Sequence, residues 1–346
     1  MQEIFALSIE ELQKQFAVLG LPSYRATQVF QWMHQKFVYD FEEMGNISKL
    51  DRKALGASFT ILPKEIKILK RLDSEDGITS KLLLQLQDGS LVETVLMHHD
   101  YGYSVCVSSQ VGCDMHCAFC ASGLTGCERS LTKEEILAQI YLCNGILRPL
   151  GQKVSRVVVM GSGEPMLNFE NVFGALDFLH SVLNISYRNM TVSTCGIIPG
   201  IIKMQQLGHP INLAISLHSV REEIRNELMP INKAYPFIKV LAAAESYASA
   251  SGRDVTYEYI LIKEVNDLAK DAKLLANLLK FKRASVNLIP VNPVAEKGWQ
   301  RPEQRRITRF LNLLNSEHIT CTIRKEMGAD INAACGQLRN QFIEEK

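Results

Sequence analysis

The architecture follows from residues 104–120, SVCVSSQVGCDMHCAFC, in which a short apolar strand leads into a loop with three cysteines. After this loop, short apolar strands alternate with amphipathic helices. The expected strands are 104–109, 156–160, 190–194, 212–216, 255–262 and 285–290, and the expected helices lie near 132–144, 168–180, 199–207, 236–251, 268–279 and 303–316. Six strand–helix units with strands that are apolar on both faces predict an α/β fold, a parallel sheet covered by helices.

The closure of this sheet is not fixed by the pattern. Six units fall short of the eight that close a complete barrel. A partial (β/α)6 barrel and an open doubly wound sheet both fit, and periodicity does not separate them.

Residues 1–100 show a different pattern and are expected to form a helical accessory region with a β-hairpin. Ser8 and Glu11 form a capping box ahead of a first helix, and apolar residues recur at helical spacing from Tyr24 to Phe37. Two strands, 81–87 and 91–97, flank Asp88-Gly89, a strong two-residue turn signal. The remaining divisions are a core over 101–325 and a C-terminal loop over 326–346.

Composition excludes several protein classes. The 346 residues carry 38 Lys and Arg against 37 Asp and Glu, a net charge of +1, which argues against indiscriminate nucleic-acid binding but leaves room for local basic patches. No apolar run is long enough to cross a bilayer, and the acidic amphipathic N-terminus is unlike a secretory signal. Nine cysteines, five of them between residues 106 and 127, predict a cytoplasmic protein whose clustered thiols bind metal or do chemistry.

The cysteine loop is the first candidate site. Cys113, Cys117 and Cys120 follow the first strand, at the carboxyl edge where α/β folds place ligands. Three thiolates can hold an iron–sulfur cluster or zinc, and the adjacent His116 offers zinc a fourth ligand. Both metals remain open on spacing alone.

The C-x3-C-x2-C spacing, with Phe119 before the last cysteine, resembles the signature of radical S-adenosylmethionine enzymes. The resemblance implies a [4Fe–4S] cluster with Cys113, Cys117 and Cys120 as ligands and one iron left for S-adenosylmethionine. It also implies a partial (β/α)6 barrel, in agreement with the six units.

Further residues at the carboxyl ends of the strands match the cofactor-binding positions of that family. Met160-Gly-Ser-Gly163-Glu164-Pro165 resembles its glycine-rich segment, in which Gly-Glu meets the methionine amino end of the cofactor. By the same resemblance the other cofactor contacts are Ser193, Ser216, Leu217, His218 and Asn292. The plain structural alternatives are a tight turn with a solvated Glu164 and ordinary polar caps.

One branch of the family matches nearly the whole chain. The segments 104–113 and 328–338 (GADINAACGQL), together with Tyr24-Arg25, Gln28, Trp32 and residues 40–44, resemble radical enzymes that methylate carbon 2 of an adenine in 23S rRNA. This implies 23S rRNA as substrate, tRNA as a second one, and an electron donor such as flavodoxin or ferredoxin. By resemblance the helical N-terminal region is an RNA-binding element.

The chemistry implied by this branch requires two further thiols. Adenine carbon 2 is electron-poor and has no acidic proton, whereas a thiolate accepts a sulfonium methyl group readily. By resemblance Cys335 is methylated first, a deoxyadenosyl radical takes hydrogen from that methyl group, and the carbon adds to adenine. Cys106 then helps to remove the ring proton and forms a disulfide with Cys335.

Glu93 is a second candidate for proton removal. On its expected strand it shares a face with Leu91, Val95 and Met97, and apolar surroundings raise the proton affinity of a carboxylate to a level that suits a general base. The matching glutamate of the family has that role. The alternative is an edge-strand glutamate that reaches water.

Three rival functions remain on sequence alone. The sister branch methylates carbon 8 of the same adenine with the same cysteines, although Glu164-Pro165 and the Trp32 region favour the carbon-2 branch. A radical enzyme acting on a small molecule would give Cys106 and Cys335 no function. A zinc- or iron-stabilised RNA-binding protein would make no use of an open coordination site.

Overall fold

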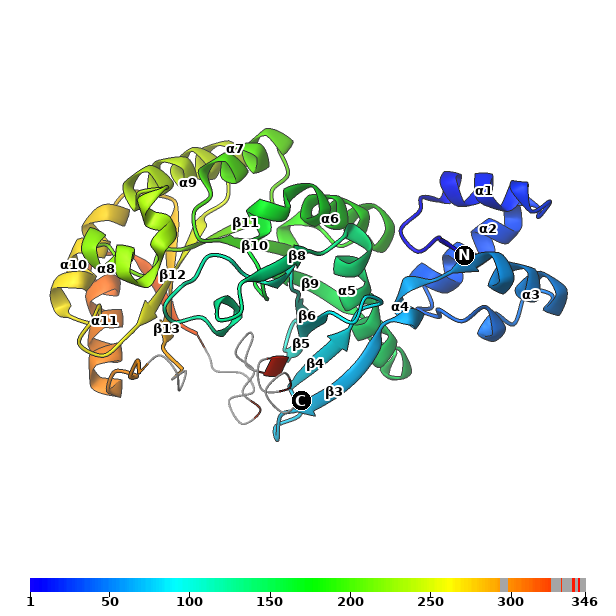
Figure 1. Cartoon of the computed structure of the whole chain (residues 1–346). Helices are drawn as coiled ribbons and strands as arrows, with labels where there is room; N and C mark the ends of the chain where they lie inside the picture. Colours follow the sequence, from blue (N-terminus) through cyan, green and yellow to red (C-terminus); the bar gives the residue numbers. More distant parts are fainter. Residues whose placement is uncertain (293–297, 325–330, 332–337, 340–341, 343–346) are drawn as a thin grey trace.

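The computed structural model describes residues 1–292, 298–324, 331, 338–339 and 342. One curved sheet of ten strands dominates it, in the order β14-β13-β12-β11-β10-β9-β6-β5-β4-β3. The seven strands from β6 to β14 along this order are parallel, while β3, β4 and β5 join the β6 edge in antiparallel pairs. Helices cover the convex side of the sheet, as Figure 1 shows, which gives the partial barrel rather than the flat alternative.

The strands are β1 Gln2–Glu3, β2 Phe59–Thr60, β3 Lys67–Asp73, β4 Thr79–Gln85, β5 Leu91–His99, β6 Gly102–Cys106, β7 Gln110–Gly112, β8 Cys127–Ser130, β9 Val154–Val159, β10 Met190–Thr194, β11 Asn212–Ser216, β12 Val255–Leu261, β13 Ala284–Pro290 and β14 Thr320–Ile323. The helices are α1 Ile9–Val18, α2 Ser23–His34, α3 Lys49–Ser58, α4 Leu62–Glu65, α5 Lys133–Leu147, α6 Phe169–Leu183, α7 Ile198–Leu207, α8 Glu222–Leu228, α9 Phe237–Ser251, α10 Ala269–Leu279 and α11 Gln304–Ser316.

All six expected strand–helix units are confirmed, as are the capping box of α1 and the hairpin of β4 and β5 around Asp88-Gly89. The sequence analysis missed the helices α4 and α8, the edge strands β3 and β14, the short pair of β1 and β2, and the small hairpin of β7 and β8. Strands β3 to β5, which lie within the expected accessory region, are hydrogen-bonded into the barrel sheet. The barrel sheet therefore extends to Lys67 on its N-terminal side.

The two faces of the sheet differ in chemistry. On the helix-covered face, Val92, Leu96 and Val105 belong to the main apolar core, and the Thr94 hydroxyl donates to Gln139 Oε1 of α5 at 2.9 Å. On the opposite face, alternation places small and polar side chains in neighbouring registers. These are Cys106, Thr191, Ser193, Ala214, Ser216, Thr256, Glu258, Ser285 and Asn287. A concave face of this kind suits a polar ligand.

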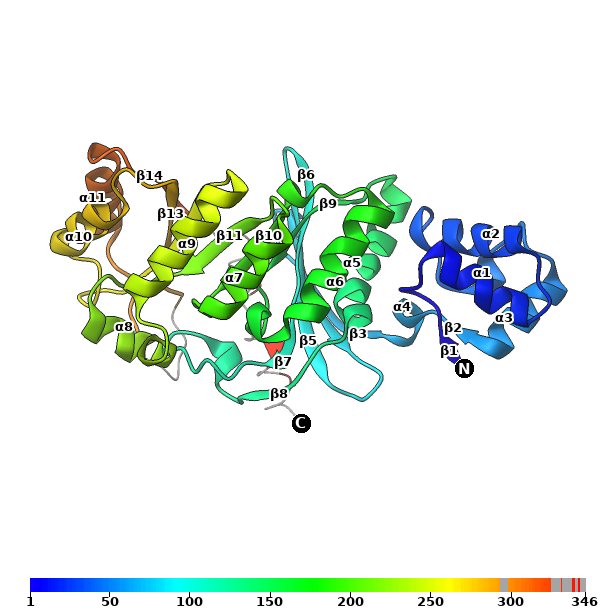
Figure 2. The same cartoon turned by 90° about the horizontal axis from the view of Figure 1, so that it is seen from above.

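The N-terminal helices α1 to α3 pack beside the barrel, next to α5 (Figures 1 and 2). His34 at the end of α2 is buried, and its Nδ1 lies 2.8 Å from the hydroxyl of Tyr141 on α5. The Tyr39 hydroxyl donates to the Tyr141 carbonyl at 2.7 Å, and the Phe5 ring packs edge-on against Tyr141. An aromatic contact with internal hydrogen bonds therefore joins the two parts.

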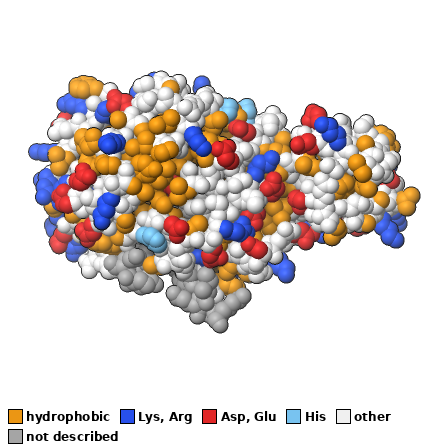
Figure 3. All heavy atoms as spheres, turned by 45° about the horizontal axis from the view of Figure 1, so that its top comes forward, with side chains coloured by type: hydrophobic (Ala, Val, Ile, Leu, Met, Phe, Trp, Pro, Cys, Tyr) orange, Lys and Arg blue, Asp and Glu red, His pale blue; other side chains and the backbone are white. Residues whose placement is uncertain are grey.

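Acidic and basic side chains are interspersed over the face seen in Figure 3, in keeping with the near-zero net charge. Several lysine and arginine side chains form ion pairs with acidic neighbours: Lys64 with Asp40, Arg283 with Asp254 and Arg306 with Asp267. In the part of the chain that the structure describes, no helix is both long and apolar enough to cross a membrane.

Candidate radical site

The cysteine loop is closed at its base by the hairpin of β7 and β8. Gly112 pairs with Cys127, and the Cys113 amide donates to the Gly126 carbonyl at 2.9 Å. Gly112 has a φ of +80°, and a Cβ there would lie 1.9 Å from the Gly126 carbonyl oxygen. Only glycine fits such an approach of two backbones. Asp114 secures the other side of the loop by accepting the Cys127 amide at 2.6 Å.

The three motif cysteines are partly buried in this loop, and none of them is in a disulfide. Burial, together with the neighbouring Cys120, raises the pKa of Cys113 to about 12, and burial likewise raises the pKa of Cys117. The Cys113 and Cys117 thiols are therefore protonated in the metal-free protein, and metal binding must release their protons.

The arrangement of these thiols bears on the choice of metal. Within the described residues, no three His, Cys, Asp or Glu side chains are placed to hold a single metal ion. Zinc requires its donors to converge on one point, whereas the thiolates of a [4Fe–4S] cluster each bind a different iron. His116, the expected fourth zinc ligand, is exposed, and its Nδ1 lies 3.3 Å from the Gly123 carbonyl oxygen. The donor set fits the cluster better than zinc.

Helix α8 places a buried cation near the cysteine loop. Arg225 is fully buried and donates to the carbonyls of Cys195, Ser216 and Leu217 and to Asn232 Oδ1, at 2.6 to 3.2 Å. Within the described residues, no carboxylate forms an ion pair with it. Burial lowers the pKa of Arg225 to about 10, and Cys117 and Cys195 are close enough to oppose that shift.

Such a buried charge is costly unless an anion lies nearby. A thiolate-bound iron–sulfur cluster would supply that anion. The same helix holds the loop directly, because the Ala118 amide donates to the Leu228 carbonyl at 2.9 Å.

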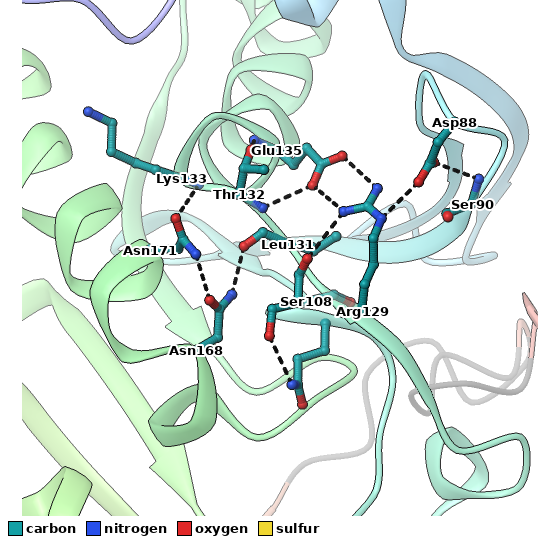
Figure 4. Close-up of polar contacts among 12 residues, drawn as sticks. Asp88, Ser90, Ser108, Arg129, Leu131, Thr132, Lys133, Glu135, Asn168 and Asn171 are labelled. Carbon is teal, nitrogen blue, oxygen red and sulfur yellow. Dashed lines mark hydrogen bonds and ion pairs between the residues drawn. The ribbon is translucent and has the colours of Figure 1, made fainter.

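The exit from the cysteine loop is fixed by a polar network, drawn in Figure 4. The Arg129 guanidinium lies between Asp88 of the β4–β5 turn and Glu135 in the first turn of α5, at 2.8 and 2.7 Å. The Asn168 amide donates to the carbonyls of Ser109 and Leu131 at 2.8 and 2.7 Å. The network ties the loop to the β4–β5 hairpin and to the start of α5.

Gly163 and Glu164 follow β9, at the carboxyl edge of the sheet as expected. Gly163 has a φ of +103°, and a Cβ there would lie 2.6 Å from Gln110 Cβ. Gln110 Oε1 accepts the Glu164 amide at 2.9 Å. The Glu164 carboxylate is buried and accepts the amides of Met166 and Cys195 at 3.0 and 2.8 Å, so it is not the solvated glutamate of the plain alternative. Burial raises its pKa, and these bonds oppose the rise.

Ser193, Leu217 and His218 meet around one residue that the sequence analysis did not select, Glu258 of β12. The Ser193 hydroxyl donates to Glu258 Oε2 at 3.1 Å, and the amides of Leu217 and His218 donate to the Glu258 carbonyl. A glutamate in the otherwise apolar run VTYEYILI is the sequence signal that could have identified it.

His218 is buried as a neutral imidazole. Burial lowers its pKa to about 3, with a smaller effect from Arg225. Its Nδ1 accepts the Ile260 amide at 3.1 Å, so the proton resides on Nε2. The ring of Phe119, the aromatic residue of the cysteine motif, packs edge-on against His218 at 4.6 Å. This contact brings the cysteine loop to the end of β11.

The other expected cofactor contacts lie on the same edge. Ser216 is half-buried at the end of β11, and its carbonyl accepts Arg225. Asn292, two residues after β13, is exposed, and no contact among the described residues ties it to the other site residues. Gly163, Glu164, Ser193, Leu217 and His218 thus lie close to the cysteine loop or to one another. The part that these residues, Ser216 and Asn292 play in cofactor binding remains a prediction.

Glu93 and Cys106 lie on the same polar face of the sheet. Cys106 is directly opposite Val95 in the β5–β6 pair, which makes Glu93 its diagonal neighbour. Both side chains are buried. The expectation of purely apolar surroundings for Glu93 was wrong, because the Lys81 ammonium lies 3.1 Å from Glu93 Oε2. Lys81 reaches it from β4, where it is paired with Val95.

The C-terminal segment returns to this place. The Arg339 amide donates to Glu93 Oε1 at 2.7 Å. The buried Arg339 side chain donates to the Thr125 hydroxyl at 3.0 Å and pairs with Glu128, both near the cysteine loop. Cys335 lies outside the described residues, so its role remains a prediction.

Comparison with known proteins agrees with this geometry. Residues 2–61 match the ribosomal RNA large subunit methyltransferase N-terminal domain, and residues 107–275 match the radical SAM superfamily. The crystal structure of a radical SAM methyltransferase from Sphaerobacter thermophilus is 37% identical, with a TM-score of 0.92 over 97% of this chain and 99% of that one.

Two relatives carry the name "Probable dual-specificity RNA methyltransferase RlmN". The protein from Symbiobacterium thermophilum is 48% identical over 98% of this chain and 92% of its own length. The protein from Spiroplasma citri is 46% identical over 98% of this chain and 97% of its own. With the three-cysteine loop, the partial barrel and these matches over nearly its whole length, the chain belongs to the RlmN family of radical S-adenosylmethionine RNA methyltransferases, whose cofactors are a [4Fe–4S] cluster and S-adenosylmethionine.

Proposed function

We propose that this chain is a cytoplasmic enzyme that methylates carbon 2 of a specific adenine in 23S rRNA, and carbon 2 of an adenine in tRNA, through a methyl group carried on Cys335. The observation that supports the proposal most is the bond between the Arg339 amide and Glu93. Cys335 precedes Arg339 by four residues, a span of at most about 14 Å even in an extended chain. A chain of that length would let the Cys335 thiol reach the face that carries Glu93 and Cys106.

When bound, the iron–sulfur cluster and S-adenosylmethionine supply the methyl group, the hydrogen-abstracting deoxyadenosyl radical and an electron acceptor. The chain supplies the rest. The Cys335 thiolate takes the methyl group, and after loss of one hydrogen atom the carbon binds adenine carbon 2. Glu93 or Cys106 takes the ring proton. The Cys106 thiolate then attacks the Cys335 sulfur, so that an S–S bond forms as the S–CH2 bond breaks and the released carbon takes a proton.

The polar face of the barrel and the buried groups around it position the cofactor. Glu164, Ser193 and His218 are fixed by bonds to backbone or to Glu258, so they can present preorganised polar atoms to the amino acid end and the ribose of S-adenosylmethionine. His218 is neutral at physiological pH and donates through Nε2. The adenine substrate must leave its RNA stack to reach this depth.

The RNA substrates are inferred from the relatives, whose name states dual specificity. The N-terminal region, which matches a ribosomal RNA methyltransferase domain, is proposed as an RNA contact, and a flavodoxin or ferredoxin as the electron donor. Arg25 and Trp32, which carry part of the resemblance, hold this region together: Arg25 pairs with Asp51, and the Trp32 indole donates to Asn46.

The test is the position of the new methyl group. The anaerobically reconstituted enzyme is incubated with unmethylated 23S rRNA and, separately, with unmethylated tRNA, and the nucleosides are compared by mass spectrometry with 2-methyladenosine and 8-methyladenosine standards. We expect 2-methyladenosine from both RNAs. Only 8-methyladenosine would assign the chain to the sister reaction, and no methylated adenosine from either RNA would refute the proposal.

A further inference from the structure

Lys81 is a buried cation on the catalytic face that the proposed chemistry does not yet use. The Lys81 side chain has no exposed surface. Its Nζ lies 3.1 Å from Glu93 Oε2, and the Glu93 side chain is only 5% exposed. In register, Lys81 of β4 lies opposite Val95 of β5, and Val95 lies opposite Cys106 of β6. Lys81, Val95 and Cys106 therefore lie side by side across three neighbouring strands, on the same face of the sheet.

We propose that Lys81 is a positioning residue that pairs with the Glu93 carboxylate and directs one of its oxygens toward the substrate for removal of the adenine ring proton. This inference rests on the proposed function, since it assigns Glu93 as the base. The proton goes from carbon 2 to Glu93, the electrons of the C–H bond stay with the ring, and Lys81 keeps its own protons throughout.

The two carboxylate oxygens of Glu93 have different partners, and this supports the positioning role of Lys81. Oε2 faces Lys81, which is part of the sheet, whereas Oε1 accepts the Arg339 amide from the C-terminal segment at 2.7 Å. The contact with Lys81 is thus built into the barrel, and the contact with Arg339 depends on where the C-terminal segment lies. We assign the ring proton to Oε1, because Oε2 is held by Lys81.

The charges around Glu93 point the same way. Among the described residues, Glu93 contacts Lys81 from β4 and the Arg339 amide from the C-terminal segment, and Cys106 of β6 is its diagonal neighbour. The Arg339 guanidinium is directed to Glu128 and Thr125 instead. The ion pair with Lys81 therefore offsets part of the cost of burying this carboxylate.

A stability cycle tests the coupling without any turnover. Lys81→Met, Glu93→Gln and the double variant are unfolded thermally in the full-length chain. Each single change removes one member of a buried ion pair, so we expect losses on the order of 5–10 °C in Tm. The double variant should be more stable than the sum of the two losses predicts. Additive losses would refute the pairing. Lys203→Met, which removes the ammonium of the exposed pair with Glu170, is the matched control and should leave Tm nearly unchanged.

A kinetic partition tests the role in proton removal. Lys81→Met should methylate Cys335 at the wild-type rate but form methylated RNA at least tenfold more slowly, because the Glu93 carboxylate has lost the group that holds it in place. Lys81→Arg, which keeps the charge, should restore most of the rate of RNA methylation. A wild-type rate of RNA methylation in a folded Lys81→Met protein, or no rescue by Lys81→Arg, would overturn the proposal.

The two inferences fail in different ways. If Glu93→Gln forms product at the wild-type rate, Glu93 is not the base, and the proposed role of Lys81 fails with it even when the stability cycle shows coupling. If Glu93→Gln is inactive but Lys81→Met forms methylated RNA at the wild-type rate, Lys81 has no part in the step, while the proposed function stands.

Discussion

Gly163→Ala perturbs the cofactor-binding segment by a single methyl group. The residue has a φ of +103°, and the added carbon would lie 2.6 Å from Gln110 Cβ and 2.7 Å from Ser109 Oγ. Either the backbone of residues 161–164 moves or Gln110 shifts. Since Gln110 Oε1 accepts the Glu164 amide, both movements displace Glu164.

The magnitude follows from these two contributions. A non-glycine residue at positive φ costs about 1–3 kcal/mol. A buried amide that loses its acceptor costs about 1–3 kcal/mol more. If residues 161–164 relax in the free enzyme, S-adenosylmethionine must restore the strained conformation on binding. The two costs then add to about 2–6 kcal/mol of lost binding free energy. At 1.4 kcal/mol per factor of ten, this weakens binding by at least roughly 30-fold.

The assay is equilibrium binding of labelled S-adenosylmethionine to reconstituted protein with matched iron content. Gly151→Ala is the control, because Gly151 also has a positive φ, +63°, but an added Cβ there would meet nothing within 4 Å. It should lower Tm slightly and leave cofactor binding unchanged. A Gly163→Ala enzyme that binds the cofactor within twofold of wild type would refute the assignment of this segment.

Three further changes probe other parts of the account. Arg339→Ala removes the contacts to Thr125 and Glu128. The amide at position 339 should then exchange its hydrogen about ten- to a hundredfold faster. Unchanged exchange would mean that these contacts do not hold the C-terminal segment. Cys106→Ala should leave the enzyme joined to RNA through Cys335, seen as a slow band on a denaturing gel, and free methylated RNA at the wild-type rate would exclude Cys106 from the release step. His34, whose pKa is lowered to about 3 by burial, stays neutral in the folded protein, while the unfolded chain binds a proton below about pH 6.5. Stability should therefore fall as the pH falls from 6.5 toward 3, by up to about 1.4 kcal/mol per pH unit, and His34→Gln should flatten this slope in urea unfolding; an equal slope in both proteins would contradict the burial argument.

The sequence predicted the six strand–helix units because buried parallel strands and amphipathic helices have clear periodicities. The edges of the sheet had no such signal. Strand β14 has four residues with alternate exposure, and α8 offers few apolar residues in the run EEIRNEL. Yet α8 carries Arg225 and holds the cysteine loop, so a site element was missed because it is short and polar.

The cysteine ligands and the glycine-rich segment could be predicted because their residue types lie close together in the chain. Lys81, Glu258 and Arg225 could not, since their meaning depends on strand register and tertiary contact. Lys81 lies in a hairpin strand, where a lysine is expected to reach water. The pairing of Lys81 with Val95 puts it on the face of the sheet that carries Glu93, and its ammonium lies beside that carboxylate.

The central claim is that Cys335 carries the methyl group, and the mass of the peptide that contains it is the most direct test. The protein is purified anaerobically with iron supplied, incubated with S-adenosylmethionine and digested. We expect a Cys335 peptide heavier by one methylene, with the added mass on the sulfur and absent after Cys335→Ala. A wholly unmodified Cys335 in protein with a full complement of iron would contradict the two-cysteine mechanism and leave only the radical barrel.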